Sequence, residues 1–204
     1  MTERSGPESE FDAIVLAGGG ASRLGGVDKP MLPINGRTLL DGVLTACAGA
    51  RRNVVVGPIR AVSREVIWTR EQPPGAGPAA ALAAGLPFCE GAEYVIVLAA
   101  DLPFIDATVV HSLWTTAIGE ASDGAVAVDE SGHQQWLTAC YRRSSLLARL
   151  AELGPDEIVG LSLRRLLRGL RLARLETARL ATFDCDTWEE VEAARAAGGV
   201  AQLE

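Results

Sequence analysis

The stretch that decides the fold is FDAIVLAGGGASRLGGVDK, residues 11–29. Its first seven residues form a short apolar run in which successive rather than alternate positions are apolar. This pattern predicts a strand that is buried on both faces. The run stops at the glycines Gly18–Gly20, and ligands of α/β proteins bind beyond the carboxyl ends of such strands. We therefore expect the glycine-rich turn to lie at a binding edge.

Strands and helices alternate through the first half of the chain. Apolar runs predict strands at residues 53–57, 64–68 and 94–100, and apolar spacing predicts helices at residues 37–47 and 77–86. The run at 94–100 is the strongest, and Asp101 follows it directly. This order is typical of a three-layer α/β/α fold with a mainly parallel, Rossmann-like sheet.

The second half of the chain is less regular. The predicted elements are strands at residues 124–128, 137–141 and 182–185. Ser162 is placed to cap a short amphipathic helix that Gly169 ends. Asp186 or Thr187 is placed to cap a last helix, which has two acidic residues in its first turn.

Length and charge limit the classes of protein to which this chain can belong. Its 204 residues are enough for one well-packed domain, which we place at residues 11–204 after a flexible tail of ten residues. The net charge is −7, and the chain has no block of Lys and Arg large enough to form a basic face. We therefore expect no nucleic-acid partner. A polyanionic small ligand would need a few local positive groups and a metal ion.

Neither the start of the sequence nor its cysteines suggest an exported or membrane-bound protein. The first ten residues are polar and acidic, and no stretch reaches the roughly 18 apolar residues that span a bilayer. We expect a cytoplasmic protein with no membrane partner. The cysteines lie far apart, which favours small buried apolar side chains over a zinc site or disulfides. They are Cys47, Cys89, Cys140 and Cys185.

The glycine-rich turn carries the chemistry that suits a triphosphate. It is not a P-loop, because Gly25 is followed by Gly26, and it is not a dinucleotide fingerprint, because Arg23 stands where the third glycine belongs. Glycines nevertheless expose backbone N–H groups and allow a ligand to approach closely. Arg23 and Lys29 add two cations, one a planar fork and the other a mobile point charge. The alternative is an ordinary glycine-rich turn with surface charges.

The segment LAGGGASRLGGVDK (residues 16–29) resembles the signature L-A-G-G-x-S-x-R-M-G-x-x-K of the molybdenum cofactor nucleotidyltransferases, which have the sugar-nucleotide transferase-like fold. Its G-G-V-D-K ending is most similar to the guanylyltransferase branch. The resemblance continues at residues 77–80, 100–103 and 183–187. It is strong over the first 105 residues and thin between residues 106 and 181.

This resemblance implies transfer of GMP from GTP, or of another nucleotide, to molybdopterin, with release of pyrophosphate and with Mg²⁺ as cofactor. It leaves room for transient contact with other proteins of molybdenum cofactor synthesis. The catalytic residues that it implies are Arg23, Lys29 and Asp101. The nucleotide-binding residues that it implies are Leu16, Ala17, Gly18, Gly19, Gly20, Ser22, Arg23, Gly25, Lys29, Gly77, Pro78 and Asp101.

Asp101 is the expected metal ligand, because Mg²⁺ is usually bound through one or two carboxylates together with substrate phosphates. The alternative for Asp101 is a helix cap, for which Asp106 competes. Asp186 is a candidate for a second carboxylate ligand. Gly77 and Pro78 also have an alternative, as a turn and the first residue of a helix. Alanines replace the Leu and second Gly of the family's G-P-L-A-G segment after Pro78, which leaves the base open.

The site for the acceptor is the least defined. Arg164, Arg165 and residues 133–136 are candidates for a pterin-phosphate site. A histidine such as His133 is more often a solvated loop residue, and the alternative for Trp136 is that it covers the core. Two other functions stay open. One is a related transferase with another base or acceptor, such as a molybdopterin cytidylyltransferase or a sugar- or polyol-phosphate enzyme. The other is a non-catalytic nucleotide-binding module, against which the presence of Arg23, Lys29 and Asp101 argues.

Overall fold

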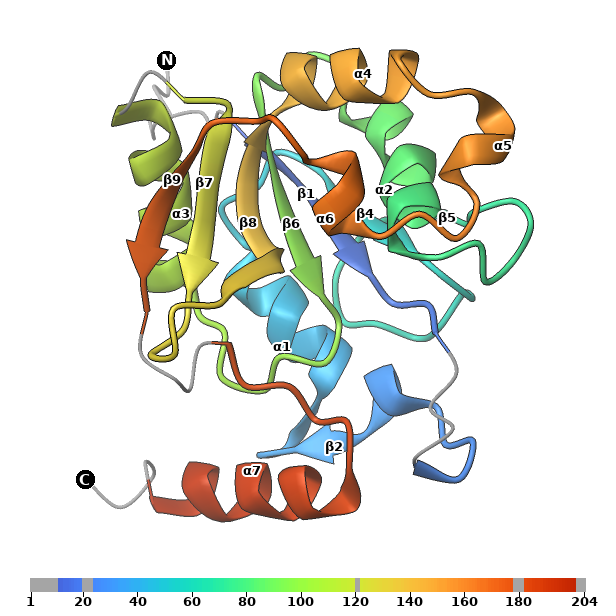
Figure 1. The fold of residues 1–204 in the computed structure, drawn as a ribbon. Helices are drawn as coiled ribbons and strands as arrows, with labels where there is room; N and C mark the ends of the chain where they lie inside the picture. Colours follow the sequence, from blue (N-terminus) through green and yellow to red (C-terminus); the bar gives the residue numbers. More distant parts are fainter. Residues whose placement is uncertain (1–10, 20–23, 120–121, 178–181, 201–204) are drawn as a thin grey trace, which may run out of the picture.

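The computed structural model describes residues 11–19, 24–119, 122–177 and 182–200. Its central sheet has seven strands in the order β5-β4-β1-β6-β8-β7-β9 (Figure 1). The strands are β1 (Phe11–Leu16), β4 (Asn53–Val56), β5 (Ile67–Thr69), β6 (Tyr94–Ala99), β7 (Gly124–Val128), β8 (Gln134–Arg142) and β9 (Leu172–Glu176). Only β8 runs antiparallel to its neighbours among these strands, so the mainly parallel sheet expected from the sequence is confirmed.

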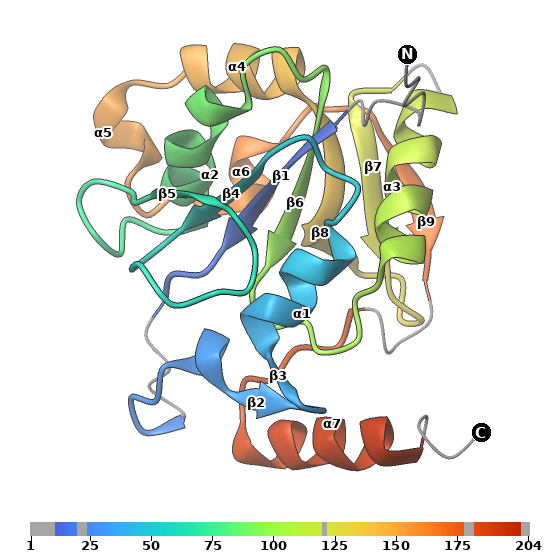
Figure 2. The ribbon, with the colours of Figure 1, turned by 180° about the vertical axis from the view of Figure 1, so that it is seen from behind.

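Helices cover both faces of the sheet and make three layers. Figure 1 shows α2, α4, α5 and α6 on one face, and Figure 2 shows α1 and α3 on the other. The helices are α1 (Leu39–Ala46), α2 (Pro78–Gly85), α3 (Ala107–Gly119), α4 (Arg143–Ala151), α5 (Pro155–Ile158), α6 (Leu163–Leu166) and α7 (Trp188–Val200), with the 3₁₀ turns η2 (Lys29–Met31) and η3 (Leu86–Cys89). The three-layer architecture predicted from the alternation of elements is therefore correct.

Strand β1 lies in the middle of the sheet, as its sequence predicts. All six of its residues are buried, and it pairs in parallel with β4 on one side and β6 on the other. Val15 packs into the cluster beneath α1 and α3, whereas Ile14 packs into the cluster beneath α2 and α6. The one acid in the strand, Asp12, is fully buried and accepts a hydrogen bond from Arg51 at 3.2 Å.

A smaller hydrophobic cluster lies beyond the carboxyl end of the sheet. There α7 packs on a hairpin of β2 (Pro33–Ile34) and β3 (Arg37–Thr38) (Figures 1 and 2). The buried members of this cluster are Leu24, Leu32, Ile34, Leu39, Cys185, Val191 and Ala194. It holds the segments that carry Lys29 and Asp186 beneath the end of β6.

Some sequence expectations were wrong in detail. The last strand expected at residues 182–185 is absent from the structure, because Cys185 is buried in this smaller cluster and the segment pairs with no strand. The strand expected at 64–68 begins at Ile67. Strand β9 and helix α4 were not expected.

One expectation from composition agrees with the structure. All four cysteines are free and buried, as expected for small apolar side chains. No helix within the described residues is long and apolar enough to cross a bilayer. The proposed tail, residues 1–10, lies outside the described residues.

Gly85 at the end of α2 allows this helix to approach the sheet closely. A Cβ atom there would lie 3.0 Å from Ile14 Cγ2 and 3.1 Å from Val56 Cγ2. We predict that Gly85→Val lowers the free energy of unfolding by about 1–3 kcal/mol, because the core would be overpacked. The matched change Gly119→Val, where a Cβ would meet no atom within 4 Å, should shift it by less than about 0.5 kcal/mol. Chemical denaturation measures both; equal losses would contradict the prediction.

Candidate active site

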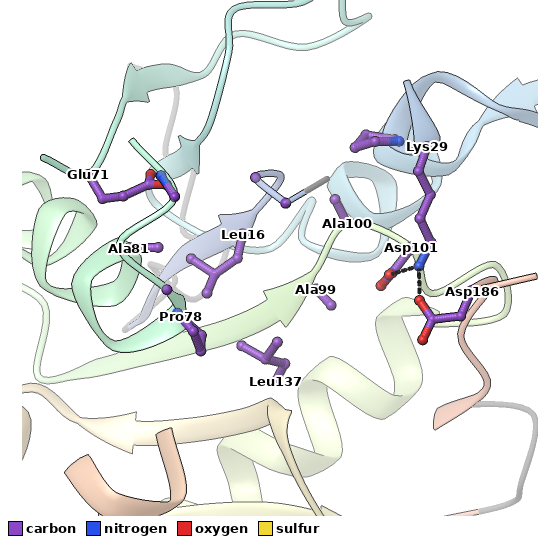
Figure 3. A pocket seen from close by; sticks show the side chains of 15 residues that line it. Leu16, Lys29, Glu71, Pro78, Ala81, Ala99, Ala100, Asp101, Leu137 and Asp186 are labelled. Atoms are coloured by element: carbon purple, nitrogen blue, oxygen red, sulfur yellow. Dashed lines mark hydrogen bonds and ion pairs between the residues drawn. The ribbon is translucent and has the colours of Figure 1, made fainter. Parts of the chain in front are cut away.

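A cleft of about 540 Å³ opens where the parallel strands β1 and β6 end (Figure 3). It is lined by Leu16, Gly18, Gly19, Lys29, Pro30, Glu71, Gly75, Gly77, Pro78, Ala81, Ala99, Ala100, Asp101, Leu137 and Asp186. The floor is apolar, and charged side chains lie at its two ends. This is the edge of the sheet at which the sequence predicted a binding site.

Most of the residues implied by the resemblance lie in this cleft. The lining includes Leu16, Gly18, Gly19, Lys29, Gly77, Pro78, Asp101 and Asp186. Ala17 is buried beside it, and its N–H donates to the carbonyl of Val56 at 2.8 Å. Gly25 does not line the cleft but has a φ of +71°, a conformation that glycine adopts readily. Gly20, Ser22 and Arg23 lie outside the described residues.

Gly77 and Pro78 form the start of helix α2 and also line the cleft. Gly77 precedes α2 with a φ of +95°, and Pro78 is the first residue of the helix. The backbone of these two residues is thus both a turn and part of the cleft wall, since the glycine brings the start of α2 against the cavity.

Lys29 lies between two carboxylates at one end of the cleft (Figure 3). Its ammonium donates to Asp186 Oδ1 at 2.5 Å and to Asp101 Oδ2. Burial disfavours the charged amine, but the charges and hydrogen bonds of Asp101 and Asp186 outweigh burial and raise the pKa of Lys29. Lys29 is therefore a cation at neutral pH.

Helix capping does not account for either carboxylate. The N–H of Val109 donates to Asp106 Oδ1 at 2.9 Å, so Asp106 caps α3 and Asp101 does not. Thr187 caps α7, because its hydroxyl accepts from the N–H of Glu190 at 3.3 Å while Glu190 accepts from the N–H of Thr187 at 2.7 Å. Asp106 and Thr187 are therefore the helix caps, and Asp101 and Asp186 are not.

Asp101 has an unused acceptor. Its Oδ1 is buried and has no hydrogen-bond partner, a costly arrangement for a carboxylate oxygen. Among the described residues no cluster of three His, Cys, Asp or Glu side chains is placed to hold a metal by itself. The donor set is thus two carboxylates, which fits Mg²⁺ better than zinc, because Mg²⁺ takes its remaining ligands from substrate phosphates and water.

Glu71, which was not expected from the sequence, lies at the opposite end of the cleft from Lys29 (Figure 3). The residue is only 6% exposed, and its Oε1 accepts from the N–H of Gly75 at 2.9 Å. Its Oε2 is buried without a partner. The signal for this residue is its position, since an acid just beyond a parallel strand lies at the same edge as Asp101.

Arg60 joins the two ends of the glycine-rich turn. Its Nε lies 2.9 Å from both carboxylate oxygens of Asp28, and one terminal nitrogen donates to the carbonyl of Ala17 at 2.9 Å. The side chain is only 10% exposed. Ala17 precedes the turn and Asp28 is next to Lys29, so this clamp fixes the ends of the segment that carries the lysine.

We predict that Arg60→Met loosens this turn. Loss of hydrogen bonds to a charged partner costs about 1.5–3 kcal/mol, so amide exchange at Gly18, Gly19 and residues 24–28 should accelerate at least about tenfold. Arg64→Met, which changes an exposed arginine in the same connection between β4 and β5, serves as the control. Asp28→Asn should accelerate the same amides. Unchanged exchange in the Arg60 variant would show that the clamp does not hold the turn.

The chain is similar in sequence to a known family and to known proteins. A family model described as the MobA-like NTP transferase domain matches residues 13–178. A molybdenum cofactor guanylyltransferase of Bradyrhizobium sp. (strain ORS 278) is 37% identical over 129 residues, which are 59% of this chain and 60% of that protein. A probable molybdenum cofactor guanylyltransferase of Methanosarcina acetivorans is 30% identical over 158 residues, 71% of this chain and 69% of that protein. The chain spans about three fifths of the length of the first curated relatives it matches.

Solved structures share the fold at lower identity. Molybdopterin-guanine dinucleotide biosynthesis protein A from Archaeoglobus fulgidus has a TM-score of 0.71 at 19% identity, covering 93% of this chain and 99% of that chain. The 2-C-methyl-D-erythritol 4-phosphate cytidylyltransferase of Thermus thermophilus has a TM-score of 0.65 at 20% identity, covering 92% and 98%. These likenesses establish the fold alone. The family model spans most of the sequence, and the chain belongs to the MobA-like NTP transferase domain family.

Proposed function

We propose that this protein transfers GMP from GTP to the phosphate of molybdopterin, releasing pyrophosphate and forming a molybdopterin guanine dinucleotide. The observation that carries the proposal is the cleft with a lone carboxylate at one end and a lysine between two carboxylates at the other. The relatives named as molybdenum cofactor guanylyltransferases support it. We place the reaction in the cytoplasm, with transient contact to other proteins of the same synthesis.

Glu71 supports guanine as the base. Guanine presents N–H donors at N1 and N2 along one edge, whereas adenine N1 and cytosine N3 are acceptors. The buried Oε2 of Glu71 can accept from such donors, which would satisfy an oxygen that otherwise has no partner. Facing an acceptor, the same carboxylate would be repelled. Gly77 and Pro78 would border the base as a close backbone wall.

The opposite end of the cleft suits the triphosphate. Lys29 is a cation there, and the N–H groups of the glycine-rich turn begin at Gly18. We assign to Lys29 and Arg23 the stabilisation of the departing pyrophosphate, with the turn amides sharing its charge. The clamp made by Arg60 would hold Lys29 in position for this role.

We assign Mg²⁺ to Asp101 and Asp186, because these two carboxylates and the unpartnered Oδ1 of Asp101 match its ligand preference. When bound, the ion would orient the α-phosphate and offset the charge that develops on it. The attacking group is a phosphate monoester with a second pKa near ~6, so it is already largely dianionic at neutral pH. The protein therefore needs no general base, and its residues act by positioning and by electrostatics.

We predict that Asp101→Asn lowers turnover at least about a hundredfold, because an amide replaces a charged metal ligand at the reacting phosphate. Asp106→Asn keeps a residue able to cap α3 and should retain turnover. Pyrophosphate release with GTP, Mg²⁺ and molybdopterin measures both variants, and circular dichroism checks their folding. Turnover that is unchanged in a folded Asp101→Asn protein would remove Asp101 from the mechanism.

We predict that Glu71→Gln reduces the preference for GTP over ATP and CTP by about tenfold or more, because the amide offers one acceptor and one donor in place of a carboxylate. Calorimetric titration of GTP, CTP and ATP with Mg²⁺, on the unaltered protein and on this variant, tests the base. Tighter binding of CTP or ATP to the unaltered protein would favour a related transferase. Failure of all three nucleotides to bind would overturn the proposed function.

A further inference from the structure

A second cavity, of about 520 Å³, lies between α6 and the start of β8. Gln134 and Trp136 of β8 form part of its wall, and Arg164, Arg165 and Arg168 in and just after α6 form another. Helix α6 lies over the same face of the sheet as α2, which borders the nucleotide cleft (Figure 1). The two cavities are therefore on one side of the sheet.

The arginines face outward because of the pattern of the helix. Leu163 and Leu166 are buried in the core, which leaves the adjacent Arg164 and Arg165 exposed, and Arg168 is exposed about one helical turn further on. The turn is fixed at both ends. The Ser162 hydroxyl accepts from the N–H of Arg165 at 3.4 Å, and Arg149 Nε donates to the carbonyl of Leu166 at 3.1 Å.

These arginines carry charge that no carboxylate offsets. Within the part of the chain that the structure describes, none of the three has an ion pair, whereas the nearby Arg149 pairs with Glu152. The protein as a whole has a net charge of −7, so the three guanidinium groups without ion pairs make this cavity wall locally positive on a negatively charged protein. Such groups bind anions and stack on flat rings.

A bulge in β8 separates this cavity from the nucleotide cleft. Val126 of β7 pairs with Ala139, but the next residue, Ala127, pairs with Gln135, so the register shifts across residues 136–138. Consecutive side chains consequently serve different cavities, since Trp136 lines the arginine-walled cavity and Leu137 lines the nucleotide cleft. One bulge thus forms the wall shared by the two cavities.

We propose that the arginine-walled cavity holds the body of the acceptor, a flat heterocycle with anionic substituents, while its reacting phosphate lies in the neighbouring cleft. This rests on the proposed function and names the part of the acceptor that the second cavity takes. Trp136 supplies a ring for stacking, and Arg164 and Arg165 supply hydrogen bonds to anionic groups. Gln134 adds an amide for the polar edge of the ring.

The experiment compares two fluorescent pterins, pterin-6-carboxylate and the uncharged 6-methylpterin, by titration of their emission with the full chain. The unaltered protein should bind the carboxylate more tightly. In the double variant Arg164→Gln/Arg165→Gln this preference should fall about tenfold or more, because two charge-assisted partners are lost. Trp136→Leu should weaken both pterins alike, and Arg64→Gln, an exposed arginine outside the cavity, should change neither.

Affinity for GTP with Mg²⁺ is measured on the same proteins and should be unchanged in the arginine variants. An intact pterin preference in a folded double variant overturns this inference, as does the absence of saturable pterin binding by the unaltered protein. Displacement of the pterin by GTP also overturns it, since the pterin would then lie in the nucleotide cleft. Failure of the unaltered protein to bind GTP is a separate result, which counts against the proposed function.

Discussion

The ammonium of Lys29 joins three segments of the chain that are far apart in sequence. It contacts Asp101, which follows β6, and Asp186, which precedes α7 and lies 157 positions after Lys29 in the chain. Two carboxylates brought together repel one another, and a cation between them offsets that repulsion. The contact therefore attaches the smaller hydrophobic cluster to the sheet at the place where the cleft ends. These three groups, one lysine and two carboxylates, have a net charge of −1. A divalent cation beside them would change this to +1, which attracts phosphate.

The sheet owes its two cavities to the direction of β8. Parallel strands present their carboxyl ends at one edge, whereas β8 runs antiparallel and presents its start there. Thr138 in β8 consequently pairs with Leu98 near the end of β6, although the two residues are 40 positions apart in the chain. The bulge then sends neighbouring side chains, Trp136 and Leu137, into different cavities. Strand direction and bulge together place the proposed acceptor beside the nucleotide.

Short sequence patterns correctly predicted the buried strands and the helix caps, which depend on neighbouring residues in the chain. The continuous apolar runs identified β1 and β6 as buried parallel strands, and the caps at Ser162 and Thr187 follow from their hydroxyls. The strand predicted at residues 182–185 was wrong. Cys185 gives this segment the alternating pattern of a strand, but it is buried because it packs against helix α7 and the hairpin. Glu71 and Arg60 were missed, since their roles depend on partners such as Gly75 and Asp28 that no short pattern reveals.

Because α7 packs against the hairpin, the site is completed late in the synthesis of the chain. Leu24, Leu32 and Ile34 leave the ribosome early, but the residues that cover them, Cys185, Val191 and Ala194, are synthesised more than 140 residues later. The second carboxylate beside Lys29 arrives with the same late segment. The sheet strands can pair before then, whereas the charged end of the cleft is completed only when the segment around residues 185–194 has been added. A nascent chain short of that point has the scaffold of the protein without its finished site.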